Sequence, residues 1–390
     1  MKSIDVKNKS NCCGCLSCLS VCPKQCISAV TDEEGFIYPS VDTNKCVLCG
    51  KCSTVCPVIN SDSCKNDILN DIAYAYVDSD ESIVKESSSG GAFSLIMDAF
   101  ANSYTDYEII GAAFDGIEVK HIAKNSRNEA NIFRKSKYIQ SNTSGIFAFA
   151  KQRLNAGAGV LFSGTPCQVA ALKRFLGKEY ENLLTVDIVC HGVPSQTCFD
   201  EYIQEIEKSR KSKIVSVEFR YKSCFESEKP NPRTINLIFA DGNNVVMDIS
   251  ESKFLYAYYT GLIYRPSCAK CKFASSERPG DITLGDYWGI EKLHPKLNSL
   301  KGVSLVRFNN AKGKLWGGSF IKKGAFIVTS WEFACNENHQ LKSPATPHRN
   351  REKFFKLRSK GVSFLENVSI CKKPDTLIQK VIRKLRLIIN

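Results

Sequence analysis

Two cysteine runs within the first sixty residues constrain this chain more than any other feature. Both have the spacing Cys-x-x-Cys-x-x-Cys-x-x-x-Cys-Pro, and they begin at Cys12 and Cys46. This run is typical of ferredoxin-type modules with two 4Fe-4S clusters, because three thiolates wrap one cube and the fourth cysteine reaches the other. Crossed pairing predicts one cluster on Cys12, Cys15, Cys18 and Cys56, and a second on Cys46, Cys49, Cys52 and Cys22. Zinc prefers two cysteine pairs separated by a long gap, so we expect clusters rather than zinc or disulfides.

Length and cysteine usage indicate the class of protein and its compartment. A chain of 390 residues exceeds the usual single core, so we expect two or three domains. Residues 1–10 are polar, and no run of eighteen apolar residues suggests a membrane span. With 19 cysteines in the chain, we expect a cytoplasmic, reducing compartment in which thiols bind metal rather than pair. Clusters of this kind also suggest an anaerobic cell.

The remaining pattern predicts a second, larger domain. Residues 1–60 form the expected ferredoxin-type module, in which β-prone segments at 27–30 and 36–39 flank an acidic glycine turn and predict a hairpin. The polar residues 61–71 are interpreted as a linker. Strands and helices then alternate, which predicts an α/β domain over 72–340, with an N-terminal part of about 72–150 and a C-terminal part of about 151–340. The expected fold class is therefore mixed α+β and α/β.

Several motifs follow predicted strands or open predicted helices. The Ser/Gly turn at 86–91 precedes a helix and could cradle a phosphate, although a capped helix start has the same pattern. Cys167 and Cys190 each follow an apolar strand, at the position where open α/β sheets bind ligands. Cys268 and Cys271 add two more thiols. Four thiols could hold a third 4Fe-4S cluster, but spacing alone favours buried small hydrophobic residues at Cys167 and Cys190.

Taken together, six motifs resemble a known family. They are Ser-Ser-Gly-Gly-Ala-Phe at 88–93, Ser-Lys-Tyr-Ile-Gln-Ser at 136–141, Gly-Thr-Pro-Cys-Gln at 164–168, Cys-His-Gly-Val-Pro-Ser at 190–195, Cys-x-x-Cys at 268–271 and Asp-Ile-Thr-Leu-Gly-Asp-Tyr-Trp-Gly at 281–289. The sequence is similar to the beta subunit of the coenzyme F-420 (deazaflavin) hydrogenases and dehydrogenases, a family that also includes flavin enzymes reducing chlorophyll derivatives. The resemblance runs from about residue 70 to about residue 335, and a fused N-terminal ferredoxin is common there.

This resemblance implies a bound FAD beside an iron-sulfur cluster, so the α/β domain is expected to bind flavin. It favours the third 4Fe-4S cluster, with Cys167, Cys190, Cys268 and Cys271 as ligands. It also implies flavin contacts at Ser88, Ser89, Gly90, Gly91, Lys137, Tyr138 and Gln140.

The expected chemistry is electron transfer. Clusters pass single electrons, most organic substrates exchange two, and a flavin does both. We therefore expect an oxidoreductase that passes electrons between ferredoxin-type clusters and a two-electron substrate or deazaflavin through FAD. The alternative is an electron-transfer subunit of a larger hydrogenase- or dehydrogenase-like complex, without substrate reduction of its own. His191 is a candidate proton donor or a structural histidine, while Lys137 and Arg220 are candidates for holding an anionic cofactor or substrate.

The expected partners follow from the same two functions. They are a ferredoxin or a deazaflavin as redox partner, a small-molecule or glycan-precursor substrate, and a partner subunit or a second copy of the chain.

The last fifty residues, 341–390, are predicted to form a basic tail. They carry 13 Lys or Arg against three acidic residues, in a chain of net charge +13. No nucleic-acid-binding motif accompanies this charge, so we expect no nucleic-acid partner. Residues 375–390 have the apolar period of an amphipathic helix with basic residues between. Two interpretations remain open: packing on the protein itself or on a second subunit, and peripheral docking on an anionic membrane.

Overall fold

The computed structural model describes residues 4, 6, 8–68, 70–222, 230–321 and 325–372. The helix predicted over 375–390 lies outside these residues, so both interpretations of it stay predictions. Among the described helices, none combines the length and apolar character that crossing a membrane requires.

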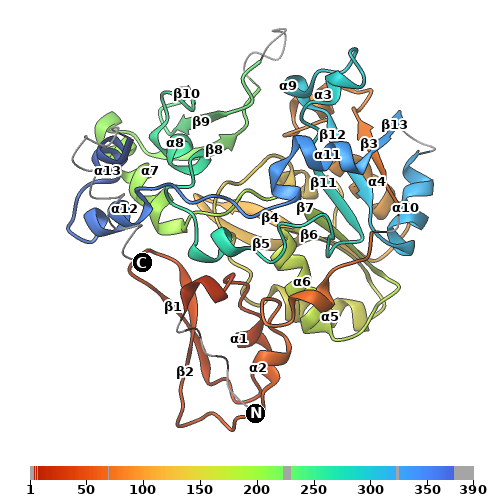
Figure 1. Cartoon of the computed structure of the whole chain (residues 1–390), viewed down its shortest axis with the longest axis horizontal. Helices are drawn as coiled ribbons and strands as arrows, with labels where there is room; N and C mark the ends of the chain where they lie inside the picture. Colours follow the sequence, from red (N-terminus) through yellow and green to blue (C-terminus); the bar gives the residue numbers. More distant parts are fainter. Residues whose placement is uncertain are drawn as a thin grey trace, which may run out of the picture.

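The N-terminal module contains the predicted hairpin. β1 (Ile27–Thr31) pairs with β2 (Ile37–Val41) in antiparallel register. The turn between them closes because the Asp32 carboxylate accepts the backbone N–H groups of Glu34, at 3.1 Å, and Phe36, at 2.9 Å. The short helices α1 (Ser17–Val21) and α2 (Lys51–Thr54) and the 3-10 helix η1 (Lys9–Asn11) complete the module. Figure 1 shows it projecting below the larger part of the molecule.

A mixed eight-stranded sheet organises the larger part, in the order β13-β3-β12-β11-β7-β6-β4-β5. The neighbours β4, β6, β7 and β11 are parallel, and the other pairings are antiparallel. The strands are β3 (Ile72–Tyr76), β4 (Tyr107–Asp115), β5 (Glu118–Lys124), β6 (Gly159–Gly164), β7 (Leu183–Ile188), β11 (Ile282–Asp286), β12 (Ser304–Phe308) and β13 (Phe326–Ser330). Because the parallel strands end at one edge, the segments that follow β6 and β7 lie together there.

Helices cover both faces of this sheet. α4 (Ala92–Ala101) and α10 (Ala311–Ile321) pack on one face, where Phe100 stacks on Trp316. α5 (Ile146–Asn155) and α6 (Pro166–Leu176) pack on the other. Alternate residues of a strand face opposite sides, so the central strands are apolar throughout. The shorter elements are α3 (Glu81–Lys85), α9 (Ser299–Gly302), α11 (Trp331–Glu337), η3 (Glu129–Phe133), η5 (Ile290–Lys292) and η6 (His339–Leu341).

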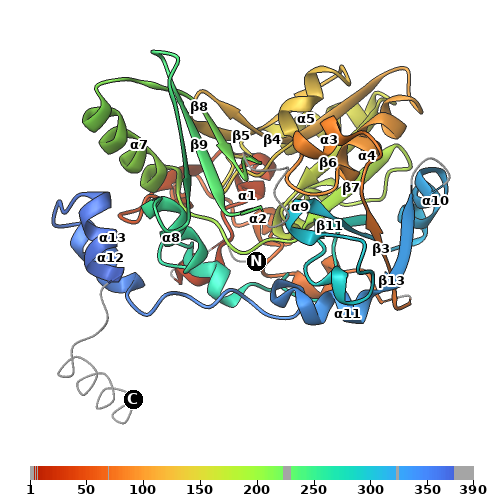
Figure 2. The same cartoon turned by 90° about the horizontal axis from the view of Figure 1, so that it is seen from above.

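A second, three-stranded sheet has the order β10-β9-β8 and forms its own layer (Figure 2). Its strands are β8 (Ile214–Phe219), β9 (Thr234–Phe239) and β10 (Asn244–Asp248). The helices around it are α7 (Gln196–Arg210), α8 (Lys253–Tyr259), α12 (Arg351–Arg358) and α13 (Phe364–Lys372). Phe199, Phe254 and Phe364 fill the space between them.

Two stretches differ from their sequence-based interpretation. The first half of the predicted basic tail is folded, because Phe354 and Phe364 are buried and Arg358 pairs with Glu201 at 2.6 Å. The predicted linker over 61–71 begins with the 3-10 helix η2 (Ser61–Cys64), and Asn66 donates side-chain hydrogen bonds to Arg278 O and Gly280 O. These polar residues satisfy buried carbonyl groups. The fold class is nevertheless as predicted, a ferredoxin-like module followed by an α/β domain.

Candidate functional site

The structure brings the first predicted set of cluster ligands together beside the α/β domain. Burial raises the pKa of Cys18, and the neighbouring thiols of Cys15, Cys12 and Cys56 raise that pKa further. Cys56 from the second run thus lies with the first run, as crossed pairing requires. Cys15 also packs in the core formed with α5 and α6.

The second predicted set lies at the far end of the module. Its four cysteines line one small hollow, and they are Cys22, Cys46, Cys49 and Cys52. Cys49 is exposed, whereas Cys52 is buried. Cys26, which the pattern left out, has its sulfur 3.4 Å from that of Cys22.

Among the described residues, no group of three or more Cys, His, Asp or Glu side chains is placed to hold one metal ion. Zinc needs its thiolates at about 2.3 Å from one centre, whereas a cube of four irons holds its four thiolates on different corners. The donor set of the module, four cysteines in each group, is the one that cubes take.

A third group of thiols lies at the sheet edge. Cys167 opens α6, Cys190 follows β7, and Cys268 and Cys271 lie in and after the 3-10 helix η4 (Pro266–Lys270). Burial raises the pKa of Cys190 well above its usual value, and the thiols of Cys268, Cys167 and Cys271 raise it further. Burial likewise raises the pKa of Cys268, to about 12. The four predicted ligands of the third cluster are therefore mutual neighbours.

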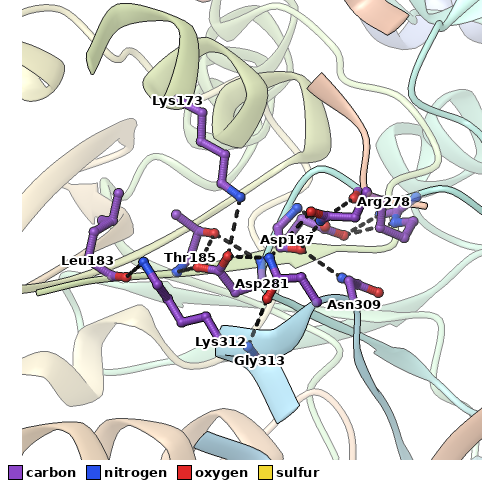
Figure 3. A network of polar contacts seen from close by, with 12 residues as sticks. Lys173, Leu183, Thr185, Asp187, Arg278, Asp281, Asn309, Lys312 and Gly313 are labelled. Atoms are coloured by element: carbon purple, nitrogen blue, oxygen red, sulfur yellow. Dashed lines mark hydrogen bonds and ion pairs between the residues drawn. The ribbon is translucent and has the colours of Figure 1, made fainter. Parts of the chain in front are cut away.

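A buried ion pair joins two of the three chain segments that carry this third group, the one with Cys190 and the one with Cys268 and Cys271 (Figure 3). Arg278 and Asp187 are 1% and 0% exposed, and the guanidinium donates to the Asp187 carboxylate at 2.6 and 2.9 Å. The same guanidinium donates to Ile188 O and Phe273 O, each at 3.2 Å. Ile188 lies two residues before Cys190, and Phe273 two residues after Cys271. The sequence analysis assigned no role to this pair, because its members are 91 positions apart.

The other carboxylate oxygen of Asp187 and the nearby Asp281 extend the network. Asp187 accepts the Gly280 N–H at 2.8 Å. Asp281 accepts the Thr185 hydroxyl at 2.7 Å and faces Lys173 at 3.3 Å (Figure 3). Each buried charge thus has partners, as buried ions require.

A cavity of about 1070 Å³ adjoins the third group of thiols. Its lining includes all four of those cysteines together with His191. It also includes six of the seven predicted flavin contacts, namely Ser88, Ser89, Gly91, Lys137, Tyr138 and Gln140. The hydroxyls of Ser88 and Ser136 lie 2.9 Å apart, so the first two motifs meet at this cavity.

Gly90 is the predicted contact that does not line the cavity. A Cβ atom there would lie 2.2 Å from Tyr76 O and 2.8 Å from Ser304 N. Its N–H donates to the Ser304 hydroxyl at 3.0 Å. The glycine is required by close packing of the turn on β3 and β12, and its assignment as a flavin contact stays a prediction.

Lys137 and Gln140 are engaged with the protein itself. The Lys137 ammonium donates to the carbonyl oxygens of Ile132 at 2.8 Å and Arg134 at 2.5 Å. Burial, together with the charge of Lys135, lowers the pKa of Lys137 to about 7. The Gln140 amide donates to Cys13 O at 2.9 Å and accepts from Arg265 at 3.0 Å. Their observed contacts therefore shape the cavity wall and dock the module.

Tyr138 and His191 keep a face toward the cavity. The Tyr138 ring stacks on Tyr258 with centroids 4.3 Å apart. Burial lowers the pKa of His191 to about 4. The imidazole of His191 is therefore uncharged at neutral pH. It can donate a hydrogen bond through its neutral N–H, but not as an imidazolium.

Cationic side chains dominate the charged part of the lining. Arg134, Arg220 and Arg233 line the cavity. Its acidic lining residues are Glu337 and Asp286, and Asp286 pairs with Arg220 at 2.5 Å. The Nε atoms of Arg134 and Arg220 are buried without a hydrogen-bond partner. Arg220 also has a left-handed backbone, with φ 58°, a conformation that is costly for a long side chain. Unsatisfied buried donors and an excess of positive charge fit an anionic ligand.

Arg265 fastens the module to the α/β domain and was not singled out from the sequence. It is 1% exposed, and it donates to Cys12 O at 2.7 Å and Ile37 O at 2.9 Å. Its guanidinium also lies 4.2 Å from the centre of the Tyr38 ring. The Thr143 hydroxyl adds a bond to Cys15 O at 2.8 Å.

The fold and these thiol groups define an iron-sulfur protein of oxidoreductase type, in which a ferredoxin-like module is docked on an α/β domain. Residues 11–60 match the 4Fe-4S dicluster domain, and residues 157–332 match the family described as the C terminus of the coenzyme F420 hydrogenase/dehydrogenase beta subunit. The chain thus matches the C-terminal domain of this beta-subunit family over residues 157–332, behind a dicluster module, and the resemblance drawn from the motifs is confirmed there.

A solved structure gives a weaker likeness. It is a chain of the F420-reducing [NiFe] hydrogenase complex from Methanosarcina barkeri, determined as a xenon derivative. The two chains are 15% identical with a TM-score of 0.45, over 78% of this chain and 91% of the other. No curated protein matches the sequence significantly.

Proposed function

We propose that the chain is a flavin- and iron-sulfur-dependent oxidoreductase. In this proposal electrons move between the two clusters of the module and a two-electron substrate or deazaflavin, by way of a third 4Fe-4S cluster and FAD. The observation that carries the proposal is that Cys167, Cys190, Cys268 and Cys271 share one cavity with the Ser/Gly turn at the start of α4. A cluster and a flavin held there would be neighbours, as electron transfer between them requires.

The order of the thiol groups supports a single route. The second cluster set lies at the exposed end of the module, and the first set lies against α5 and α6. Hydrogen bonds to Cys15 and Cys167 raise the pKa of Cys13 well above its usual value. The Cys13 thiol therefore bridges a predicted ligand of the first cluster and a predicted ligand of the third.

In this proposal, side chains of the cavity bind the pyrophosphate and the aromatic rings of FAD. Arg134, through its unpartnered Nε, and Arg220 would neutralise the pyrophosphate, which the positive N-terminus of α4 would also favour. The rings of Tyr138, Tyr259 and Trp288 would flank an aromatic cofactor. When bound, FAD supplies the exchange between one-electron and two-electron chemistry. Lys137 would act by holding the 132–135 segment in place through its carbonyl contacts.

A second candidate function is electron transfer inside a larger complex without substrate reduction by this chain. The matched family is described as a beta subunit, which favours a partner subunit. Affinity purification of the tagged chain from its native cell separates the two functions. A stoichiometric, salt-resistant partner would support the subunit, and an isolated chain that reduces a deazaflavin would support the enzyme.

Cofactor analysis of the anaerobically purified chain tests the main proposal. We expect about 12 iron atoms, from three clusters of four, and one non-covalent FAD. Cys271→Ser should lower the iron content by about four and leave the module clusters in place. A wild-type chain without flavin after incubation with FAD, or a Cys271→Ser variant with unchanged iron, would refute the corresponding part.

A further inference from the structure

The free end of the module is the end that carries the second cysteine set, Cys22, Cys46, Cys49 and Cys52. We propose that it is the docking surface for an acidic one-electron carrier protein of the ferredoxin type. This rests on the proposed function only in that the second cluster must exchange electrons with the rest of the chain. The step itself is simple: the carrier cluster loses one electron, the second cluster of the module gains it, and no proton or bond changes place.

The first observation is the exposure of this end. Cys49, a predicted ligand of the second cluster, is exposed. The two residues before it, Val47 and Leu48, are 57% and 56% exposed. Leu48 has a left-handed backbone with φ 51°, which is uncommon for a residue with a branched side chain. A strained loop that presents apolar side chains beside a cluster ligand is typical of a contact surface.

The second observation is the charge around this loop. Lys24, Lys45 and Lys51 are all exposed, and they flank the cysteines of the second set. Within the described residues neither Lys24 nor Lys51 forms an ion pair, and Lys45 pairs with Asp42 at 3.4 Å. Three lysines against one aspartate give this end a positive field, which would attract a partner of negative charge.

Apart from Asp42, the described acidic residues of the module are paired away from its free end. Asp32 and Glu33 pair with Lys9 at 2.7 and 2.6 Å. Glu34 pairs with Arg351 of α12 at 2.5 Å. These carboxylates lie in the hairpin turn, which is docked on the α/β part. The module is therefore polarised, with its acidic turn fastened to the α/β part and with Lys24, Lys45 and Lys51 around the free end.

The size of the apolar part favours a transient partner. Val47 and Leu48 form a small apolar centre within a rim of lysines. Permanent subunits bury large apolar surfaces, whereas electron-transfer encounters use small interfaces steered by charge. A small acidic carrier fits this pattern, and a permanent subunit seated here is the competing outcome that the test separates.

A charge reversal of the three lysines tests the proposal on the full, cluster-loaded chain. The variant is Lys24→Glu, Lys45→Glu and Lys51→Glu. The matched control is Lys208→Glu, Lys314→Glu and Lys356→Glu, three exposed lysines on helices of the α/β part. Stopped-flow absorbance follows bleaching of the module clusters by a reduced acidic two-cluster ferredoxin. We expect a rate constant at least about tenfold lower for the first variant at low salt, and a control within about twofold of the wild type.

Two further measurements separate docking from other causes. Reduction by dithionite should remain within about twofold in every variant, and iron content should be unchanged. Carbodiimide, which joins amines to carboxylates, should cross-link the carrier to Lys24, Lys45 or Lys51 in the wild type. Equal rates in all three proteins, or cross-links confined to other lysines, would overturn the proposal. So would a carrier complex that survives gel filtration at high salt, which would mark a permanent subunit.

The failure of the docking surface and the failure of the proposed function give different results. If the carrier reduces the module of the wild type rapidly and only the lysine variant is slow, but no electron reaches a flavin, the proposed function fails and the docking surface stands. If the lysine variant is reduced as fast as the wild type while the flavin is reduced normally, the docking surface fails and the function stands. A second variant, Leu48→Glu, keeps the lysines and should also slow reduction by the carrier.

Discussion

Arg278 and Asp187 show how much a single pair of side chains can position. A buried ion pair stabilises a protein only if the remaining donors and acceptors are also satisfied. Here the guanidinium reaches Asp187 and two backbone carbonyls, and the carboxylate accepts Gly280 N–H and the Thr283 hydroxyl. Because the two carbonyls flank the segments bearing Cys190 and Cys271, we infer that the pair positions the third group of thiols.

Arg278→Lys should therefore remove the third cluster and spare the two of the module. An ammonium keeps the charge but cannot reproduce the fork of a guanidinium, so at least one carbonyl contact is lost. We expect about four fewer iron atoms, or altered g-values of the third cluster in electron paramagnetic resonance where iron is retained. Arg153→Lys is the control, because Arg153 pairs with Glu108 away from the cavity. An unchanged third-cluster spectrum in Arg278→Lys would contradict the positioning role.

Arg134 offers a residue-scale test of FAD binding. Its Nε has no partner and it lines the cavity, whereas Arg127 of the same segment pairs with Asp98 and does not line the cavity. A hydrogen bond to a charged group is worth about 1.5–3 kcal/mol. Arg134→Gln should raise the FAD dissociation constant on the order of 10- to 100-fold, and Arg127→Gln should leave it nearly unchanged. Equal effects of the two variants on flavin fluorescence titrations would remove Arg134 from the site.

At the scale of elements, the start of α4 is decided by packing. The turn before it is pressed between β3 and β12 through Gly90, while Gly91, with φ 93°, forms the cap and lines the cavity. The glycines of this motif thus have two different jobs, one steric and one at the cavity.

Gly90→Ala should destabilise the protein by about 1–3 kcal/mol, because its Cβ would overlap the Tyr76 carbonyl oxygen. Gly318→Ala in α10 is the matched control. A Cβ there meets nothing within 4 Å, and alanine in a helix should stabilise by about 0.5–1 kcal/mol. Thermal denaturation of the two variants should therefore move in opposite directions. A Gly90→Ala variant as stable as the wild type would show that β3 and β12 can move apart.

For the whole molecule, a buried histidine links stability to pH. His121 is 5% exposed; its Nε2 donates to Ser163 O at 3.0 Å and its Nδ1 accepts from Ser141 at 2.8 Å. Burial is the main cause that lowers the pKa of His121 to about 4, and the charge of Lys137 lowers it further. Between pH 4 and 6.5 the unfolded chain therefore binds more protons than the folded one, so stability rises with pH across this window.

Lowering the pH from about 7.5 to about 5 should cost about 2 kcal/mol of stability through His121 alone. His121→Gln removes the titration and retains a donor toward Ser163. The variant should lose less of its thermal midpoint over this pH range than the wild type does. Parallel pH profiles for the two proteins would show that His121 does not contribute this dependence.

The sequence by itself determined the elements and ligand groups whose logic is local. The cysteine spacing predicted which thiols gather within the module, because a few residues of loop suffice to surround a cluster. Strand ends likewise predicted Cys167 and Cys190 at one sheet edge, and the motif order indicated the family. The roles of the cysteines as cluster ligands, and of the Ser/Gly turn and the 136–141 motif as flavin contacts, stay predictions.

Only the tertiary structure decided the features that join distant positions. It seated Gly90 against β3, turned Gln140 toward the module, and paired Arg278 with Asp187. It also folded residues 351–372 onto α7, although their charge suggested a basic tail. The physical reason is the same in each case. Such contacts depend on which buried polar groups need hydrogen-bond partners once the sheet has formed. The spacing of residues within one segment of the sequence does not indicate those partners.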